Sequence, residues 1–189
     1  PQTPDQISCF DQHHGIVSAA CSLANSSAVL NWPGAHRQWV RAGGALYGLT
    51  VATGKTGVDF GLQPAMTLST RLISTRSLKQ GDRVGYSGAF VCPEDMPIGA
   101  AAIGYGDGYP RNIRPGTQVL LNGRRVPVIG RVSMDLMTLD LRSQPDARVG
   151  DELVLWGEGL PVEEIAEAAG TISYELTCSI TRRVRFIES

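Results

Sequence analysis

The feature that most constrains the fold is a change in sequence pattern near residue 50. Before it, apolar runs of strand length alternate with helix-like segments, a rhythm typical of a parallel α/β sheet or barrel. From Gln63 onward, apolar residues alternate with polar and small ones, as in antiparallel strands. We therefore expect two domains, residues 1–50 and residues 51–189.

The first part holds only about two strands, which cannot close a sheet by themselves. We expect the end of a helix at Gln6–His14, strands at Gly15–Ser22 and Trp39–Gly48, and one helical turn at Ser27–Leu30. Residues 1–50 are thus expected to be the tail of a larger α/β domain. The start at Pro1, without a methionine, favours truncation or proteolysis of a longer chain.

The second part is expected to be mostly antiparallel β with two short helices. Asn122-Gly123 between apolar flanks predicts a hairpin. Pro161–Ala169 predicts a helix, because Pro161 stands near its start and Gly170 just past its end. The other predicted elements are strands at Met66–Thr75, Arg131–Leu141, Glu152–Trp156 and Arg183–Phe186, and a second helix at Ile172–Ile180.

Composition excludes several classes of protein. The net charge of -1 argues against a nucleic-acid protein, which needs a basic stripe. No apolar run approaches the roughly 20 residues that span a bilayer. The four cysteines contain no C-x-x-C pair and the histidines show no metal-site spacing, so we expect free thiols, no metal and a cytoplasmic protein.

Three places carry candidate chemistry. The two strand ends, Asn25-Ser26 and Gly43-Gly44, would together offer a hydroxyl and bare backbone N–H groups, which suit a phosphate. The Gly104–Arg111 segment is rich in Gly, Tyr and Asp, and Gly85–Gly88 places Tyr86 among small residues. The alternative for each place is a purely structural role, as a tightly packed turn.

Taken together, these segments resemble the alanine racemase family of pyridoxal-phosphate enzymes. The resemblance runs in order over almost the whole chain and rests on Leu23–Ser26, Trp39–Gly48, Gly85–Gly88, Gly104–Arg111, Gly130–Asp135 and Ser173–Leu176. It implies the end of a cofactor-binding (β/α)8 barrel followed by a C-terminal β domain, in a homodimer whose active sites are shared between subunits. The only lysines, Lys55 and Lys79, do not match the family's cofactor lysine.

The resemblance also implies roles for single residues. Tyr86 matches the catalytic tyrosine, one of the two bases that racemisation needs, and Arg41 matches the arginine at the cofactor's pyridine nitrogen. Met134 matches the backbone N–H that meets the substrate carboxylate, and Tyr105 a tyrosine of the substrate entrance. The phosphate ligands are matched by Ser26, Gly43, Gly44 and Tyr174, while Asp107, Arg111, Arg131 and Ile172 fall in the same region with less defined roles.

The resemblance therefore implies a racemase that interconverts L- and D-alanine for peptidoglycan synthesis. Because this chain lacks the cofactor lysine, we expect it to be inactive alone and to need the missing N-terminal barrel half. Two alternatives stay open: a fragment that acts as a dimerisation or binding module, and a racemase of broader amino-acid specificity.

Overall fold

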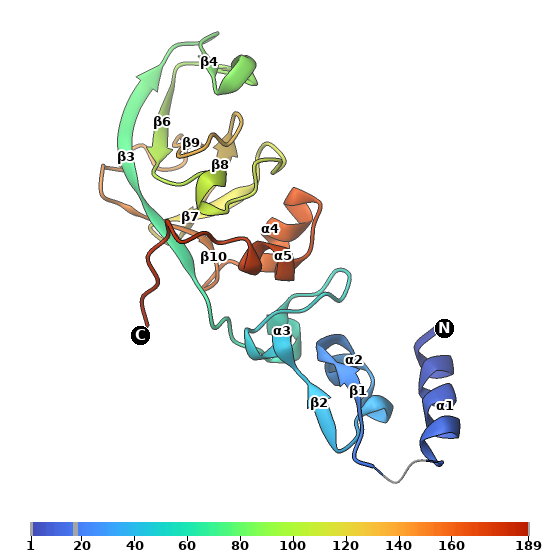
Figure 1. Ribbon diagram of the computed structural model, residues 1–189. Coiled ribbons are helices and arrows are strands. Elements are labelled where there is room, and N and C mark those ends of the chain that lie inside the picture. The colour runs from blue at the N-terminus through green and yellow to red at the C-terminus, as the bar shows by residue number, and fades with distance from the viewer. Residues whose placement is uncertain (1, 17–18, 189) are drawn as a thin grey trace. The chain divides into compact units, whose positions relative to one another are not determined.

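The computed structural model describes residues 2–16 and 19–188. The chain divides into two compact units, Pro1–Ala65 and Met66–Ser189 (Figure 1). None of the helices in the described ranges is long and apolar enough to cross a membrane.

The first unit contains a two-stranded parallel sheet with short helices. Strand β1 pairs with β2 in a register that sets Ser22 opposite Trp39 and Asn25 opposite Arg41. The parallel pairing expected from the sequence is therefore confirmed. The elements of this unit are α1 (Gln2–His14), β1 (Ser22–Asn25), α2 (Ser26–Asn31), a 3₁₀ turn (Pro33–Ala35), β2 (Trp39–Arg41), α3 (Gly43–Leu46) and a second 3₁₀ turn (Gly57–Phe60).

Both strands differ from their expected positions. The strand expected at Gly15–Ser22 begins only at Ser22, because pairing with β2 starts there; Val17 and Ser18 of that expectation lie outside the described residues. The strand expected at Trp39–Gly48 ends at Arg41. The chain then turns into α3, where the Leu46 N–H donates to the Ala42 carbonyl at 2.9 Å. Apolar runs alone did not separate a strand from the helical turn that follows it.

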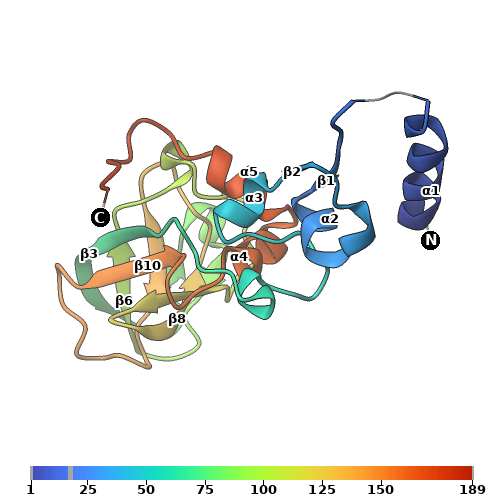
Figure 2. The same cartoon turned by 90° about the horizontal axis from the view of Figure 1, so that it is seen from below.

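The second unit is a closed antiparallel barrel with strand order β10-β3-β6-β9-β8-β7, completed by pairing of β7 with β10 (Figures 1 and 2). The barrel strands are β3 (Leu68–Leu78), β6 (Met96–Ala101), β7 (Gln118–Leu121), β8 (Arg124–Ile129), β9 (Met137–Asp140) and β10 (Glu152–Trp156). The unit also contains a separate two-stranded sheet of β4 (Arg83–Val84) and β5 (Phe90–Val91). The 3₁₀ turns are Tyr86–Gly88 and Tyr105–Asp107, and the helices are α4 (Val162–Ala169) and α5 (Ser173–Cys178). The mostly β character that the sequence predicted is confirmed.

Local sequence chemistry explains several of these elements. Asn122 and Gly123 adopt φ values of 49° and 75°, which a two-residue type I′ turn requires, and β7 pairs with β8 across them. Helix α4 ends where Gly170 takes the left-handed conformation and its N–H bonds back to the helix. The barrel interior is filled by apolar side chains from alternating positions, including Leu72, Leu121, Val128, Leu139 and Leu153.

Two of the strands predicted for the second unit are wrong in whole or in part. No strand forms at Arg183–Phe186, where the chain instead makes a turn in which the Val184 N–H donates to the Thr181 carbonyl. The strand expected at Arg131–Leu141 is confined to Met137–Asp140, since the residues before it fold into a tight turn in which the Ser133 N–H donates to the Leu136 carbonyl.

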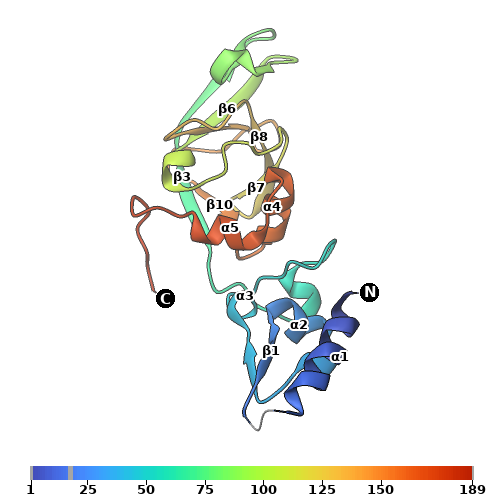
Figure 3. The same ribbon diagram turned by 45° about the vertical axis from the view of Figure 1, so that its right-hand side comes forward.

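The ends of the barrel carry different elements. Strand β3 pairs first with β10 and then with β6, and its second half leads out to the small β4–β5 hairpin. Figures 1 and 3 show this hairpin at one end of the barrel and α4 and α5 at the other. The expected site residues of this unit lie on the connections between strands and on α5.

Candidate active site

The ends of the two parallel strands come together as expected. Asn25 ends β1 and caps α2, since its side chain accepts a hydrogen bond from the Ala28 N–H at 3.0 Å. This cap places Ser26 at the start of α2, where it is only 5% exposed. The Ser26 hydroxyl accepts the Ala45 N–H at 3.2 Å. Ser26 therefore lies against the first turn of α3, which begins at Gly43.

This arrangement is suited to an anion. The first N–H groups of a helix have no partner within the helix and carry a partial positive charge. A Cβ built on Gly43 would meet nothing within 4 Å, so the space beside this residue is open. Gly44 is buried behind it. The buried Ser26 hydroxyl and the glycines that begin α3 therefore lie next to each other in the first unit.

Arg41 lies at the end of β2 and is held by β1. Its Nη1 donates to the Ser22 carbonyl at 3.1 Å and to the Ser22 Oγ at 2.9 Å, and its Nη2 donates to the Leu23 carbonyl at 3.4 Å. Because β1 pairs with β2, the backbone positions of both Arg41 and Ser22 are fixed. Sequence reasoning missed Ser22 as the residue that orients the guanidinium, although the expectation of adjacent parallel strands contained the signal.

Tyr86 stands on a turn with unusual backbone geometry. It follows Gly85, at φ 76°, and precedes Ser87, a non-glycine residue at φ 60°. A Cβ at Gly85 would lie 2.9 Å from the Arg131 backbone nitrogen, so the turn packs closely on the Gly130-Arg131 segment. The Tyr86 side chain is 64% exposed. The turn therefore presents the phenol outward from the small hairpin.

Tyr105 and Met134 lie on two turns that are joined by their backbones. The Tyr105 N–H donates to the Ser133 carbonyl at 3.0 Å, and the Gly106 N–H donates to the Met134 carbonyl at 2.9 Å. Tyr105 is 44% exposed and Met134 50% exposed. The structure thus brings together two residues that the sequence places almost thirty positions apart.

The other candidates lie elsewhere in the two units. Tyr174 is a half-buried residue of α5, in the second unit. Lys55 lies over the Phe60 ring, with its Nζ 5.0 Å from the ring centroid, and Lys79 pairs with Asp95 at 2.7 Å. Within the described ranges, no group of three or more His, Cys, Asp or Glu residues is arranged to hold a metal ion.

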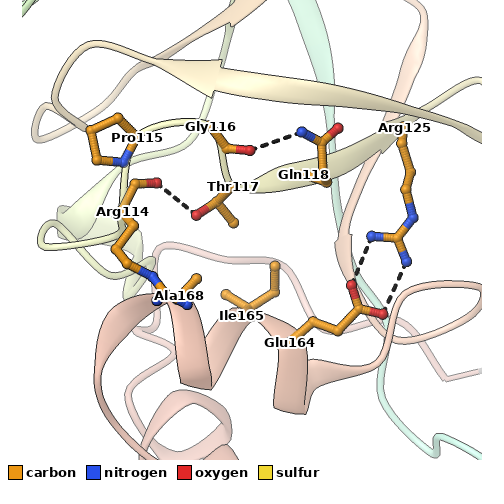
Figure 4. Close-up of a pocket in the computed structure, with 9 residues that line it drawn as sticks. All are labelled: Arg114, Pro115, Gly116, Thr117, Gln118, Arg125, Glu164, Ile165 and Ala168. Carbon is orange, nitrogen blue, oxygen red and sulfur yellow. Dashed lines mark hydrogen bonds and ion pairs between the residues drawn. The ribbon is translucent and has the colours of Figure 1, made fainter.

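A cavity of about 280 Å³ between α4 and the barrel contains none of the expected site residues (Figure 4). Arg125 makes two hydrogen bonds to the Glu164 carboxylate, at 2.7 and 2.9 Å. The Thr117 hydroxyl donates to the Arg114 carbonyl at 2.7 Å. These polar groups of the cavity lining therefore bind one another.

Two family models match the chain: "Alanine racemase, C-terminal domain" over residues 65–188 and "Alanine racemase, N-terminal domain" over residues 1–51. Alanine racemase from Nitrosococcus oceani is 53% identical over 184 residues, which are 96% of this chain and 51% of that protein. Alanine racemase from Coxiella burnetii is 53% identical over 172 residues, which are 88% of this chain and 47% of that protein.

Solved structures agree with this result. The biosynthetic alanine racemase from Pseudomonas aeruginosa superposes with a TM-score of 0.94 at 45% identity, over 97% of this chain and 51% of that one. Alanine racemase from Bartonella henselae, solved with covalently bound pyridoxal phosphate, gives a TM-score of 0.86 at 26% identity, over the same shares of the two chains. The chain spans about half the length of the curated relatives it matches. By sequence and by fold, the chain belongs to the alanine racemase family.

Proposed function

We propose that this chain is the C-terminal part of an alanine racemase that uses pyridoxal phosphate to interconvert L- and D-alanine. In this proposal residues 1–50 are the end of the cofactor-binding barrel and residues 51–189 are the C-terminal β domain. The observation that carries the proposal is the outward-facing Tyr86 on its left-handed turn, in a chain of this family. Within the described part of the chain, its hydroxyl has no hydrogen-bond partner, so it is available to a substrate.

The first unit fits the cofactor's phosphate. Ser26 supplies a buried hydroxyl, and Gly43 and Gly44 begin a helical turn beside open space. We assign Tyr174 as a fourth phosphate ligand by its match to the family. We assign Arg41 to the cofactor ring by its match to the family; there its guanidinium would donate a hydrogen bond without giving up its proton. Its anchoring on Ser22 keeps that donor oriented.

Racemisation requires a proton to leave one face of the α-carbon and another to arrive on the opposite face. When bound, the cofactor supplies the electron sink that makes the α-proton acidic enough to remove. Tyr86 then takes or returns the proton at one face. A lysine outside this chain serves the other face. Met134 holds the substrate carboxylate through its backbone N–H, and Tyr105 lines the entrance.

By the family's arrangement, Tyr86, Tyr105 and Met134 serve the cofactor held by the partner subunit, so the working enzyme is a homodimer. The relative from Pseudomonas aeruginosa is described as biosynthetic. This supports an enzyme that supplies D-alanine for peptidoglycan, and we propose a cytoplasmic location from the family alone.

The test is Tyr86→Phe in the complete racemase, compared with Tyr47→Phe, which alters another exposed tyrosine. Loss of one base lowers kcat for racemisation about 10²–10⁴-fold. With both alanine enantiomers α-deuterated, Tyr86→Phe is expected to stop deuterium loss from one enantiomer and to leave the other exchanging. Racemisation within tenfold of the parent, or a parent that does not interconvert alanine, would refute the proposal.

A further inference from the structure

The turns that carry Tyr105 and Met134 touch through backbone atoms. A Cβ at Gly104 would lie 2.2 Å from the Ser133 oxygen and 2.4 Å from the Met134 oxygen. Only a glycine allows this approach, and the two hydrogen bonds from Tyr105 and Gly106 close the contact. A shift of one turn must therefore move the other.

The same contact orients the Met134 N–H. The carbonyl of Ser133 and the N–H of Met134 belong to one planar trans peptide, so they point in opposite directions. Because the Tyr105 N–H binds that carbonyl at 3.0 Å, it fixes the plane and aims the Met134 N–H away from the Tyr105 turn. Among the described residues, the Met134 N–H makes no backbone hydrogen bond of its own.

Arg183 connects the two turns from a third segment. Its Nε lies 3.2 Å from Asp107 in the Tyr105 turn, and its Nη2 pairs with Asp135, the residue after Met134. The Asp107 side chain is only 13% exposed, and it also accepts the Gly104 N–H at 2.9 Å. A Cβ at Gly106 would lie 2.3 Å from the Arg183 Nη1, so the guanidinium packs directly on the Tyr105 turn.

The segment that carries Arg183 is itself tied to the Tyr105 turn. The Thr181 N–H donates to the Asp107 carbonyl at 3.1 Å, and the Thr181 hydroxyl donates to the Gly106 carbonyl at 2.9 Å. One cation therefore bridges two carboxylates and reduces the repulsion between them across the contact. Without it, Asp107 would keep a mostly buried charge with no ion-pair partner among the residues that the structure describes.

We propose that Arg183 is a positioning residue that holds the Met134 N–H and Tyr105 in their substrate-binding geometry by pairing with both Asp107 and Asp135. The inference rests on the proposed function, because the substrate roles of Met134 and Tyr105 come from it. Arg183 itself contacts neither the substrate nor the cofactor in this proposal.

The experiment compares Arg183→Ala, Arg183→Lys and Asp135→Asn in the complete racemase, with Arg185→Ala as the control. Arg185 is exposed, close by in sequence and, in the described structure, without an ion pair. We expect Arg183→Ala to raise KM for alanine at least tenfold with a smaller change in kcat. Propionate has alanine's carboxylate but no amine, and its inhibition constant should rise by a similar factor. Arg183→Lys should keep part of the affinity for alanine and propionate that Arg183→Ala loses.

Amide hydrogen exchange separates this inference from the proposed function. Arg183→Ala is expected to speed exchange at the Tyr105 and Gly106 amides at least tenfold and to leave the barrel strands protected. Asp135→Asn, which alters a largely exposed side chain, should give a smaller change of the same kind and serves if Arg183→Ala does not fold. Unchanged exchange at the two amides would overturn the positioning role even if the parent proves not to be a racemase. Propionate inhibition within twofold of the parent in an active Arg183→Ala enzyme would also overturn it.

Discussion

Gly104→Ala tests the contact between the two substrate-binding turns with a single methyl group. Gly104 has φ −156° and ψ −165°, extended values that alanine adopts freely, so the substitution adds no dihedral strain. The new Cβ would instead lie 2.2 and 2.4 Å from two backbone oxygens, neither of which can rotate away. The turns must separate.

The cost follows from the structure. Forcing a methyl group into a packed site costs about 1–3 kcal/mol. Separation also breaks the two backbone hydrogen bonds between the turns, each with a net value of about 1 kcal/mol. We therefore expect the barrel unit to lose about 3–5 kcal/mol of unfolding free energy.

Native-state hydrogen exchange at amides of β9 and β10 measures the stability of this unit separately from the rest of the enzyme. Gly34→Ala, in the first unit, controls for adding a methyl group without crowding, because a Cβ there meets nothing within 4 Å and the residue has no left-handed φ; it should leave exchange in β9 and β10 unchanged. In the same preparations, KM for alanine should rise at least tenfold in Gly104→Ala. A loss of less than about 1 kcal/mol would refute the reasoning, because an uncrowded replacement of glycine by alanine changes stability by at most about 1 kcal/mol, and in the stabilising direction.

Two further substitutions test the Tyr86 turn and the barrel core. Ser87→Val should lower the melting temperature, because a β-branched residue at φ 60° costs about 1–2 kcal/mol, whereas Ser87→Gly should not; equal melting temperatures would contradict the strain argument. Within the described structure, the Tyr109 hydroxyl is buried and has no partner, so Tyr109→Phe should raise the unfolding free energy by about 1 kcal/mol, as denaturant titration would show. Burial also raises the pKa of Tyr109 far above its ordinary value of 10.0. The unfolded chain therefore loses this proton first, stability falls as pH rises above 10, and Tyr109→Phe should remove that part of the decline.

Much of the architecture follows from short-range sequence chemistry. The Asn122-Gly123 hairpin formed as expected because its two residues tolerate left-handed φ, and α4 ended at Gly170 for the same reason. The meeting of Ser26 with the Gly43–Gly44 turn also followed from sequence, since parallel neighbours end at the same sheet edge. The assignment of roles to Tyr86, Met134 and Tyr174 needed the family resemblance.

The ends of the strands and the contacts that join the turns depend on how distant segments pack together. The apolar runs at Trp39–Gly48 and Arg131–Leu141 satisfied a strand pattern, but a strand exists only where a partner strand supplies hydrogen bonds. The Arg183–Phe186 segment was misjudged because its residues bind turns far away in the chain and not a neighbouring strand. Dihedral preference and side-chain period are properties of a few consecutive residues, so the sequence alone determined them. Barrel closure, the glycine-mediated contact at Gly104 and the two ion pairs of Arg183 join residues distant in sequence, and only the folded chain determines which of them meet.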